Sequence, residues 1–279
     1  MRPRVYSTEA IVLRRDDYGE ADRLLTLLTP RSGKMRVMAK GARKTTSRKA
    51  GHVELFTRVT LMLARGRLFD IVTQAEAIET HRALREDLRR GSYAHYLAEL
   101  SDQFAQEESE DAALYALLST GLMWLCEARD PSLAARLFEM RLLSLAGYRP
   151  QLFRCAKTGL PLEVDAGEAE RNTPFSPAES GTLVAGAALQ ARDVFMLSRS
   201  ALMLMRALQT REFAEINRLD VPEAVAEQVE SAMRRYFVFT LERALKSTRY
   251  IRQIENLVAG ESPDLPVKPR DASVADSPP

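Results

Sequence analysis

The residues of this chain best suited to chemistry are cations, and they gather between Arg31 and Arg67. This stretch holds eleven lysines and arginines against a single acid, Glu54. Phosphate groups are bound largely by lysine and arginine, with release of condensed counterions. The stretch therefore predicts a surface that binds a polyanion. The alternative is that these cations only keep a barrel surface soluble.

The alternation of side chains along a strand should place some of these cations on the same face of the barrel wall. Because side chains alternate along a strand, Lys34, Arg36 and Lys40 should lie on one side while the residues between them turn inward. Residues 41–49, which follow, are small or basic and are typical of a flexible basic loop next to that face. The candidate residues for binding a phosphate backbone are Lys34, Arg36, Lys40, Arg43, Lys44, Arg48, Lys49, Arg65 and Arg67.

Aromatic side chains, on which bases of a single strand could stack, are few in this region. Tyr18, Phe56 and Phe69 are the candidates. Each residue also suits a barrel core or a turn, and we expect that structural role first.

Signatures of catalysis are missing from the sequence. There is no Gly-x-Ser-x-Gly, Walker loop, dinucleotide fingerprint or His-Glu-x-x-His motif. Carboxylate pairs such as Asp16/Asp17 and Glu107/Glu108 lie in polar surroundings that would leave them solvated. We therefore expect a binding protein rather than an enzyme, with no catalytic residues and no cofactor.

The cysteines and the N-terminal residues indicate in which cellular compartment the protein works. Cys126 and Cys155 are the only cysteines, so a disulfide framework is not expected. The first ten residues lack the apolar core of a signal peptide, and no run of eighteen apolar residues follows. These patterns predict a cytoplasmic protein without a membrane anchor.

The elements that must position the cations fall into two parts of opposite charge. Residues 1–80 carry 16 basic and 9 acidic residues, a net charge of +7, whereas the rest carries 24 and 29, a net charge of −5. In the first part, alternating apolar and polar positions predict strands at 8–13, 23–28, 34–40, 54–64 and 68–78. Five short antiparallel strands favour an OB-fold barrel, with an SH3-like barrel as the alternative.

The remainder has the three-to-four-residue period of amphipathic helices. Helices are expected over 81–104, 111–128, 133–145, 194–208 and 222–246. Prolines and glycines break the period between 147 and 186, and the end of the chain has too few apolar residues to fold. The predicted organisation is α+β and multidomain: an OB-fold domain at 1–80, an α-helical bundle domain at 81–146 and 187–256, an irregular insert at 147–186, and a disordered tail at 257–279.

A series of short motifs resembles the RecO family of recombination mediators. No single motif is decisive, but their order and spacing match that family from about Val5 to Ile254. The motifs are Gly19-Glu20-Ala21-Asp22-Arg23, Gly33-Lys34 through Ala39-Lys40-Gly41-Ala42-Arg43-Lys44, Leu63-Ala64-Arg65-Gly66-Arg67, Thr73-Gln74-Ala75-Glu76, Arg136-Leu137-Phe138-Glu139 through Leu145-Ala146-Gly147-Tyr148-Arg149-Pro150, and Leu245-Lys246-Ser247.

The resemblance implies an N-terminal OB-fold, a helical domain and a non-enzymatic role in DNA repair and recombination. It further implies binding and annealing of DNA strands, single or double, partnership with RecR, and help to RecA in replacing single-strand-binding protein. A nucleoid-associated location in the cytoplasm would follow. A nucleic-acid-binding regulator or an RNA-binding protein on the same fold is the alternative, because fold alone does not fix function.

Many members of that family carry a four-cysteine zinc module in the insert, with two C-x-x-C pairs suited to tetrahedral zinc. Here Cys155 is followed three residues later by Thr158, and the second pair is replaced within 183–187. Three of the four ligands are missing, so we predict no bound metal. The residues expected to hold the insert by packing instead are Leu152, Phe153, Leu160, Phe175 and Leu183.

Two arginines, Arg136 and Arg141, interrupt the apolar helix predicted at 133–145. An unpaired charge is costly there, so pairing with Glu139 or with an acid of another helix is one explanation. The other is a partner-binding site, in which Arg136 beside an apolar groove grips the C-terminal tail of single-strand-binding protein, an acidic peptide with a hydrophobic tip. Arg141 is the second partner-binding candidate.

Overall fold

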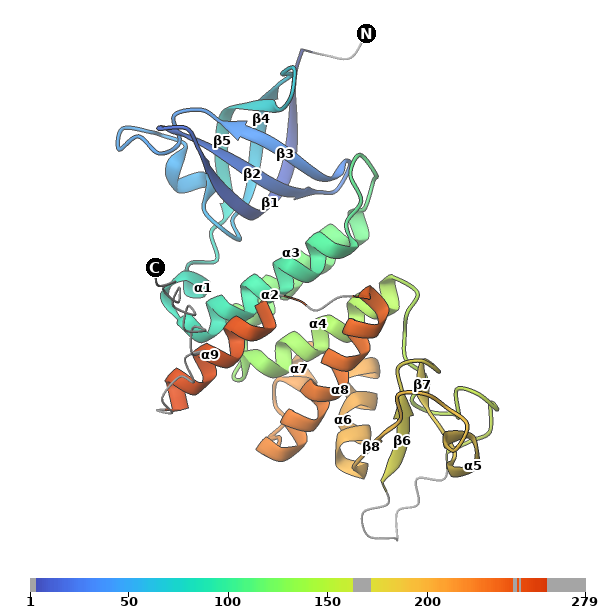
Figure 1. Ribbon diagram of the computed structural model, residues 1–279. Coiled ribbons are helices and arrows are strands. Elements are labelled where there is room, and N and C mark those ends of the chain that lie inside the picture. The colour runs from blue at the N-terminus through green and yellow to red at the C-terminus, as the bar shows by residue number, and fades with distance from the viewer. Residues whose placement is uncertain (1–3, 163–171, 243–244, 246, 260–279) are drawn as a thin grey trace, which may run out of the picture.

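The N-terminal part of the chain is a closed barrel (Figure 1). A computed structural model describes residues 4–162, 172–242, 245 and 247–259. Around the barrel the strand order is β1-β2-β3-β5-β4, closed by pairing of β4 with β1 and including a parallel β3–β5 pair. The predicted five-stranded OB-fold is confirmed. The strands are β1 (Val5–Tyr18), β2 (Asp22–Thr29), β3 (Gly33–Ala39), β4 (Arg58–Ala64) and β5 (Asp70–Glu79), with a short 3-10 helix η1 (Ala50–Val53) before β4.

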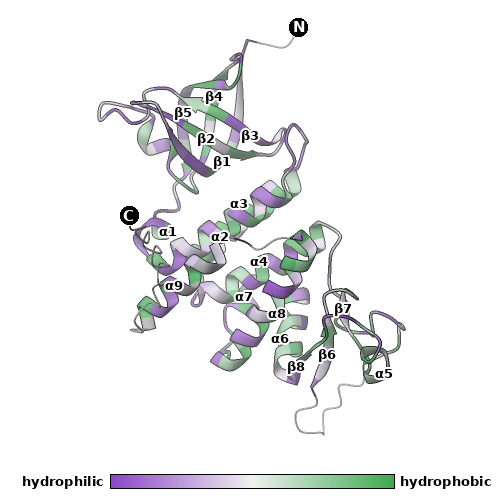
Figure 2. Ribbon diagram, in the orientation of Figure 1, coloured by the Kyte–Doolittle hydropathy of each residue, from purple (hydrophilic) through white to green (hydrophobic). Residues whose placement is uncertain are grey.

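Strand β1 serves both the barrel and the helical part. Its first half pairs with β4 and its second half with β2, and the register shifts between Val12 and Arg14. Val12 points into the barrel core, whereas Ile11 and Leu13 belong to the core of the helical part. Figure 2 shows hydrophobic and hydrophilic residues side by side along the barrel strands. The uninterrupted apolar run at 10–13 is therefore explained by burial of both faces of β1.

Helices form the body below the barrel in Figure 1. Aspartates begin three of them: Asp87, Asp111 and Asp130 each accept a backbone N–H bond in the first turn of α2, α3 and α4. The helix predicted over 81–104 is divided, because the extended backbone of Asp87 ends α1. The helices are α1 (Arg82–Glu86), α2 (Leu88–Phe104), α3 (Ala112–Glu127), α4 (Pro131–Leu145), α6 (Arg199–Thr210), α7 (Phe213–Ile216), α8 (Glu223–Leu241) and α9 (Ser247–Ala259).

Helix α4 is buried on most sides, as its apolar sequence predicted. A glycine in α3 permits a close approach: a Cβ at Gly121 would lie 2.5 Å from Phe138 Cδ2 and 3.0 Å from Leu97 Cδ2. Helices α2, α3 and α4 therefore share one tightly packed core. None of the helices in the described part of the chain is long and apolar enough to cross a membrane.

The insert is a small sheet of order β7-β6-β8 rather than an irregular segment. It comprises β6 (Thr173–Ser176), β7 (Gly181–Thr182), the short helix α5 (Ala185–Ala188) and β8 (Phe195–Leu197). Because β8 pairs with β6, the insert continues to residue 197, beyond the predicted limit of 186. The helix expected from 194 begins only at Arg199, since a short apolar run does not distinguish a strand from a helix.

Packing of the insert matches the prediction in part. Leu152, Phe175 and Leu183 are buried, whereas Phe153 and Leu160 are 44% and 56% exposed. The Phe153 ring lies at the surface beneath the Arg206 guanidinium, 4.9 Å from its centroid.

The last helix also differs from the prediction. Helix α8 ends at Leu241, before a left-handed Glu242, and a separate helix α9 follows. Residues 257–259, assigned to the tail by sequence, continue α9. The rest of the predicted tail lies outside the described residues.

The end of α2 and the segment that follows it join the body to the barrel. The Lys34 ammonium lies 3.3 Å from Asp102 Oδ1 and donates to the Asp102 carbonyl at 2.9 Å. The backbone N–H of Lys34 donates to Gln106 O at 2.9 Å. A Cβ at Gly33 would lie 2.4 Å from Gln106 O and from Ser109 O, so only glycine permits this contact. The start of β3 is consequently fixed against the helical body.

Candidate nucleic-acid interface

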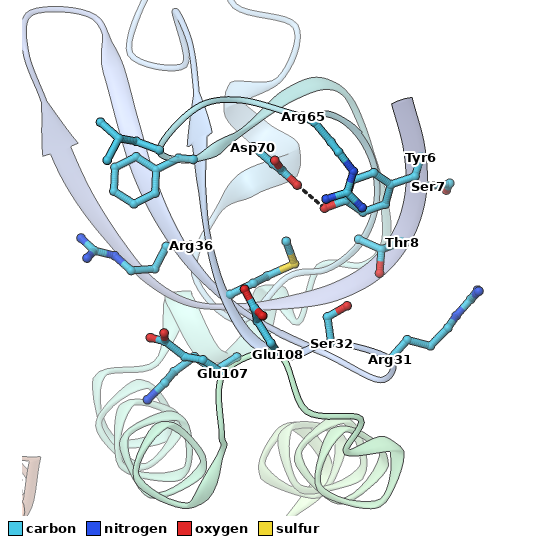
Figure 3. Close-up of a pocket in the computed structure, with 14 residues that line it drawn as sticks. Tyr6, Ser7, Thr8, Arg31, Ser32, Arg36, Arg65, Asp70, Glu107 and Glu108 are labelled. Carbon is cyan, nitrogen blue, oxygen red and sulfur yellow. Dashed lines mark hydrogen bonds between the residues drawn. The ribbon is translucent and has the colours of Figure 1, made fainter. Parts of the chain in front are cut away.

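A groove of about 790 Å³ opens on the barrel where the starts of β1 and β3 meet the β4–β5 loop. Arg31, Arg36 and Arg65 line it, each with an exposed side chain. Figure 3 shows Arg31 and Arg36 on opposite sides, with the α2–α3 segment between them. The groove thus gathers cations from three separate parts of the barrel sequence.

Two of these arginines are stacked on aromatic rings. The Arg36 guanidinium carbon lies 5.3 Å from the centroid of the Phe69 ring, and that of Arg65 lies 4.9 Å from the Tyr6 centroid. Such stacking orients a guanidinium while its N–H edge can still bind a phosphate. The groove therefore presents cations whose positions are partly set before any ligand binds.

Asp70, the first residue of β5, organises the β4–β5 side of the groove. Its carboxylate accepts a hydrogen bond from the Tyr6 hydroxyl (Figure 3). It also accepts one from the Gly66 N–H at 3.1 Å. Burial and the bond to Asp70 raise the pKa of Tyr6 well above its usual range. Tyr6 consequently stays neutral and holds the surface on which Arg65 rests.

Most of the predicted basic loop is open to solvent. Lys40, Lys44 and Arg48 are exposed, and none of them belongs to an ion pair with another residue that the structure describes. Arg43 is held at the base of the loop, 3.4 Å from Asp17 Oδ2 and 3.0 Å from Gly19 O. Arg67 is exposed in the β4–β5 loop.

Two predicted contacts are instead engaged by the protein itself. Lys34 binds Asp102 at the junction with the body, and the Lys49 ammonium donates to Val72 O at 3.0 Å. These bonds orient the two ammonium groups, and Lys34 also lines the groove, so both residues help to hold the fold and stay predicted DNA contacts. The remaining candidates surround the groove and the loop.

Acidic residues lie on one wall of the groove. Glu107 and Glu108 come from the α2–α3 segment, and both line the groove with the three arginines. A negative wall lowers the positive potential of the site. The sequence interpretation of this pair as merely solvated missed its position beside the cations.

The three aromatic candidates differ in their exposure to solvent and in their distance from the groove. Phe56 is 2% exposed, at the boundary with the body, where its ring meets His95 edge-on with centroids 4.9 Å apart. Tyr18 is 53% exposed at the β1–β2 hairpin, and Phe69 lines the groove. The sequence did not predict Tyr6 as a site residue, because nothing in its local pattern links it to Asp70, 64 residues away.

Arg136 lies inside the helical body. Its side chain is 5% exposed, 3.1 Å from the carboxylate of Glu139 and over the ring of Tyr96. The pairing explanation is therefore correct, and the assignment of Arg136 to a peptide-binding groove is wrong, because a peptide could not reach it. Burial raises the pKa of Glu139 to about 7, although Arg136 and the Tyr96 hydroxyl lower it.

Arg141 is more accessible. Its guanidinium donates to Arg211 O at 2.7 Å and lies 3.6 Å from Glu212 Oε1. It borders a surface cavity of about 290 Å³ between α3 and α4 that Leu117, Trp124 and other residues line. An apolar groove with a cation at its edge is thus present at Arg141.

Among the insert residues that the structure describes, no zinc donor set is found. Cys155 is buried and packs with Leu183 and Ala187, while Thr158 hydrogen bonds to its thiol. Those hydrogen bonds lower the pKa of Cys155 although burial opposes them. A single thiol among apolar side chains does not fit tetrahedral zinc, which needs four ligands.

Comparison with known proteins agrees with this arrangement of barrel and body. Residues 1–81 match the family described as "Recombination protein O N terminal", and residues 85–249 match "Recombination protein O C terminal". The chain is 41% identical to the "DNA repair protein RecO" of Roseiflexus sp. (strain RS-1) over 94% of its own length and 90% of that protein. It is 35% identical to the protein of the same name from Pelotomaculum thermopropionicum, over 92% and 97% of the two chains. The chain therefore belongs to the RecO family of DNA repair proteins.

Proposed function

We propose that this chain binds DNA strands without catalysing a reaction, and that the groove and the basic loop together form the binding surface. The observation that carries the proposal is the pair of arginines stacked on Phe69 and Tyr6, on a barrel that also carries exposed cations in the loop after β3. Phosphate contacts of this kind give affinity that is steep in salt and nearly independent of sequence.

The test is a salt series of fluorescence anisotropy on the full chain, with a single strand, a duplex of the same sequence and a random RNA. Charge reversal at Arg36, Lys40, Arg43 and Lys44 should abolish binding and leave the helical circular dichroism unchanged. The matched control reverses Arg129 and Arg218, which are exposed on the helical body. Loss of helicity in the first variant would make its cations structural, and strong preference for one duplex sequence or for RNA would favour a regulator or an RNA-binding protein.

The proposal extends to annealing of DNA strands and to a role as recombination mediator. We propose that the barrel holds one strand by its phosphates while the helical body docks RecR and single-strand-binding protein, which helps RecA to load. The sharper assay is annealing of complementary strands coated with single-strand-binding protein, with and without RecR. Failure to accelerate annealing would exclude the mediator role while leaving DNA binding intact. Work on the chromosome implies a cytoplasmic, nucleoid-associated location.

For the tail of single-strand-binding protein we propose the groove beside Arg141. The guanidinium there can meet a carboxylate while Leu117 and Trp124 accept an apolar side chain. Arg141→Ala should weaken binding of the labelled tail peptide in anisotropy, whereas Arg129→Ala should not. Unchanged affinity in Arg141→Ala would place the tail elsewhere.

A further inference from the structure

The β4–β5 loop exposes a large apolar side chain to solvent, which does not favour solubility. Leu68 is 89% exposed and is preceded by Arg65, Gly66 and Arg67. Leu189 in the insert is equally exposed. Only Leu68 lines the groove that holds the three arginines.

The loop that presents Leu68 is held in one conformation by its own contacts. Asp70 accepts from the Gly66 N–H, and the Arg65 N–H donates to Arg4 O at 3.0 Å. A Cβ at Gly66 would lie 2.0 Å from Phe69 O, so the turn closes on itself. Because the loop backbone is already held in place, it loses little conformational entropy when a ligand binds, and Leu68 is exposed from a fixed position.

The surroundings of Leu68 indicate what it can contact. A docking site for another protein would need a continuous apolar patch, but apart from Leu68, Phe69, Met35 and Tyr6 the groove is lined by charged and polar residues. A nucleic-acid strand has the complementary pattern, with an anionic backbone beside apolar base faces. Leucine is also among the apolar side chains that proteins insert between neighbouring base steps of duplex DNA, and a single strand is stacked in the same way with less to hold it.

We propose that Leu68 inserts between two neighbouring bases of a bound single strand and unstacks them, while Arg65 and Arg67 hold the flanking phosphates. This inference rests on the proposed DNA binding and adds a specific distortion of the strand to it. Bases separated in this way present their pairing edges to a complementary strand, which would favour annealing.

The experiment uses the full chain and a single strand with one 2-aminopurine between purines, whose fluorescence increases when it is unstacked. Anisotropy of an end-labelled strand gives the affinity in parallel. The wild-type protein should raise the 2-aminopurine emission at saturation. Leu68→Ser should weaken binding by about tenfold, the loss expected when a leucine side chain is no longer buried, and should abolish the rise in emission at saturating protein.

Two variants serve as controls. Leu68→Met keeps an apolar side chain and should retain both signals, and Leu189→Ser removes an equally exposed leucine and should change neither. If the wild-type protein binds the strand without raising 2-aminopurine emission, or if Leu68→Ser behaves as the wild type, the insertion is refuted and DNA binding stands. If no strand binds the wild-type protein, the proposed function fails together with the insertion.

Discussion

Removal of the buried Arg136 guanidinium should cost a large share of the stability of the fold. Arg136 and Glu139 are nearly inaccessible, 3.1 Å apart, and Tyr96 donates its hydroxyl hydrogen to the same carboxylate. Replacing one partner of a buried pair leaves the other without its counter-charge, so Glu139 must stay charged alone or take up a proton, at a cost of about 3–5 kcal/mol. A domain of ordinary stability has about 5–15 kcal/mol in total. Arg136→Met should therefore be strongly destabilised but not necessarily unfolded.

A double-mutant cycle isolates the pair. Glu139→Gln removes the charge while its amide oxygen can still accept from Tyr96, so Arg136→Met/Glu139→Gln leaves neither a charge nor an orphan hydroxyl. We expect a coupling energy of about 0.5–3 kcal/mol, with the double variant more stable than Arg136→Met alone. Urea unfolding followed by circular dichroism measures it. The fluorescence of Trp124, the single tryptophan, which stacks on Phe213, reports the helical body separately.

The pH dependence has a definite sign. A carboxyl whose pKa is raised in the folded state binds a proton more tightly there than in the unfolded chain, so stability falls as pH rises from about 4.5 to about 7. Without Arg136 the pKa of Glu139 rises further, because the cation lowers it. The deficit of Arg136→Met should thus widen between pH 6 and pH 8, by at most ~1.4 kcal/mol per pH unit. If Arg136→Met lowered the free energy of unfolding by less than about 1 kcal/mol, and by the same amount at every pH, this explanation would be refuted.

Three further predictions concern the groove and the core. Glu107→Gln/Glu108→Gln should tighten DNA binding by about two- to fivefold at low salt and less at physiological salt, since the acids oppose incoming phosphates; a salt series of anisotropy measures this. Lys34→Ala should lower the free energy of unfolding with little change in the salt slope, whereas Arg36→Ala should reduce that slope by about 0.7 for a single strand. Gly121→Ala should destabilise the body by about 1–3 kcal/mol in urea unfolding, because the added methyl meets a phenylalanine ring at 2.5 Å.

Local patterns predicted the barrel strands and most of the long helices of the body. Alternation of polar and apolar residues located all five barrel strands, although β1 extends five residues beyond its predicted end. Asp111 and Asp130 stand near the predicted starts of α3 and α4, whereas the start of α2 after Asp87 was not predicted. Errors arose where pattern is ambiguous over short lengths. The apolar residues 195–197 suit a helix as well as the strand β8, and only pairing with β6 decides between them.

The site was harder to predict because its members meet only in the folded chain. A count of cations located the basic region, but it could not separate Lys34, which Asp102 binds 68 residues away, from Arg36, which stacks on Phe69. The charge of Arg136 was equally ambiguous, since a buried ion pair and a binding cation have the same sequence. Long-range partners decide each of these roles, and no local spacing encodes them.

The same contacts imply that the barrel and the helical body fold as one unit. Ile11, Leu13 and Leu28 come from the barrel, yet they lie in the core of the helical part. The body also supplies the acidic wall of the groove and, through Asp102, the bond that holds Lys34. An isolated barrel would expose those apolar residues and lose one side of its own binding site. Its DNA affinity would then report a different surface, so the contribution of each groove residue has to be measured by substitution in the full chain.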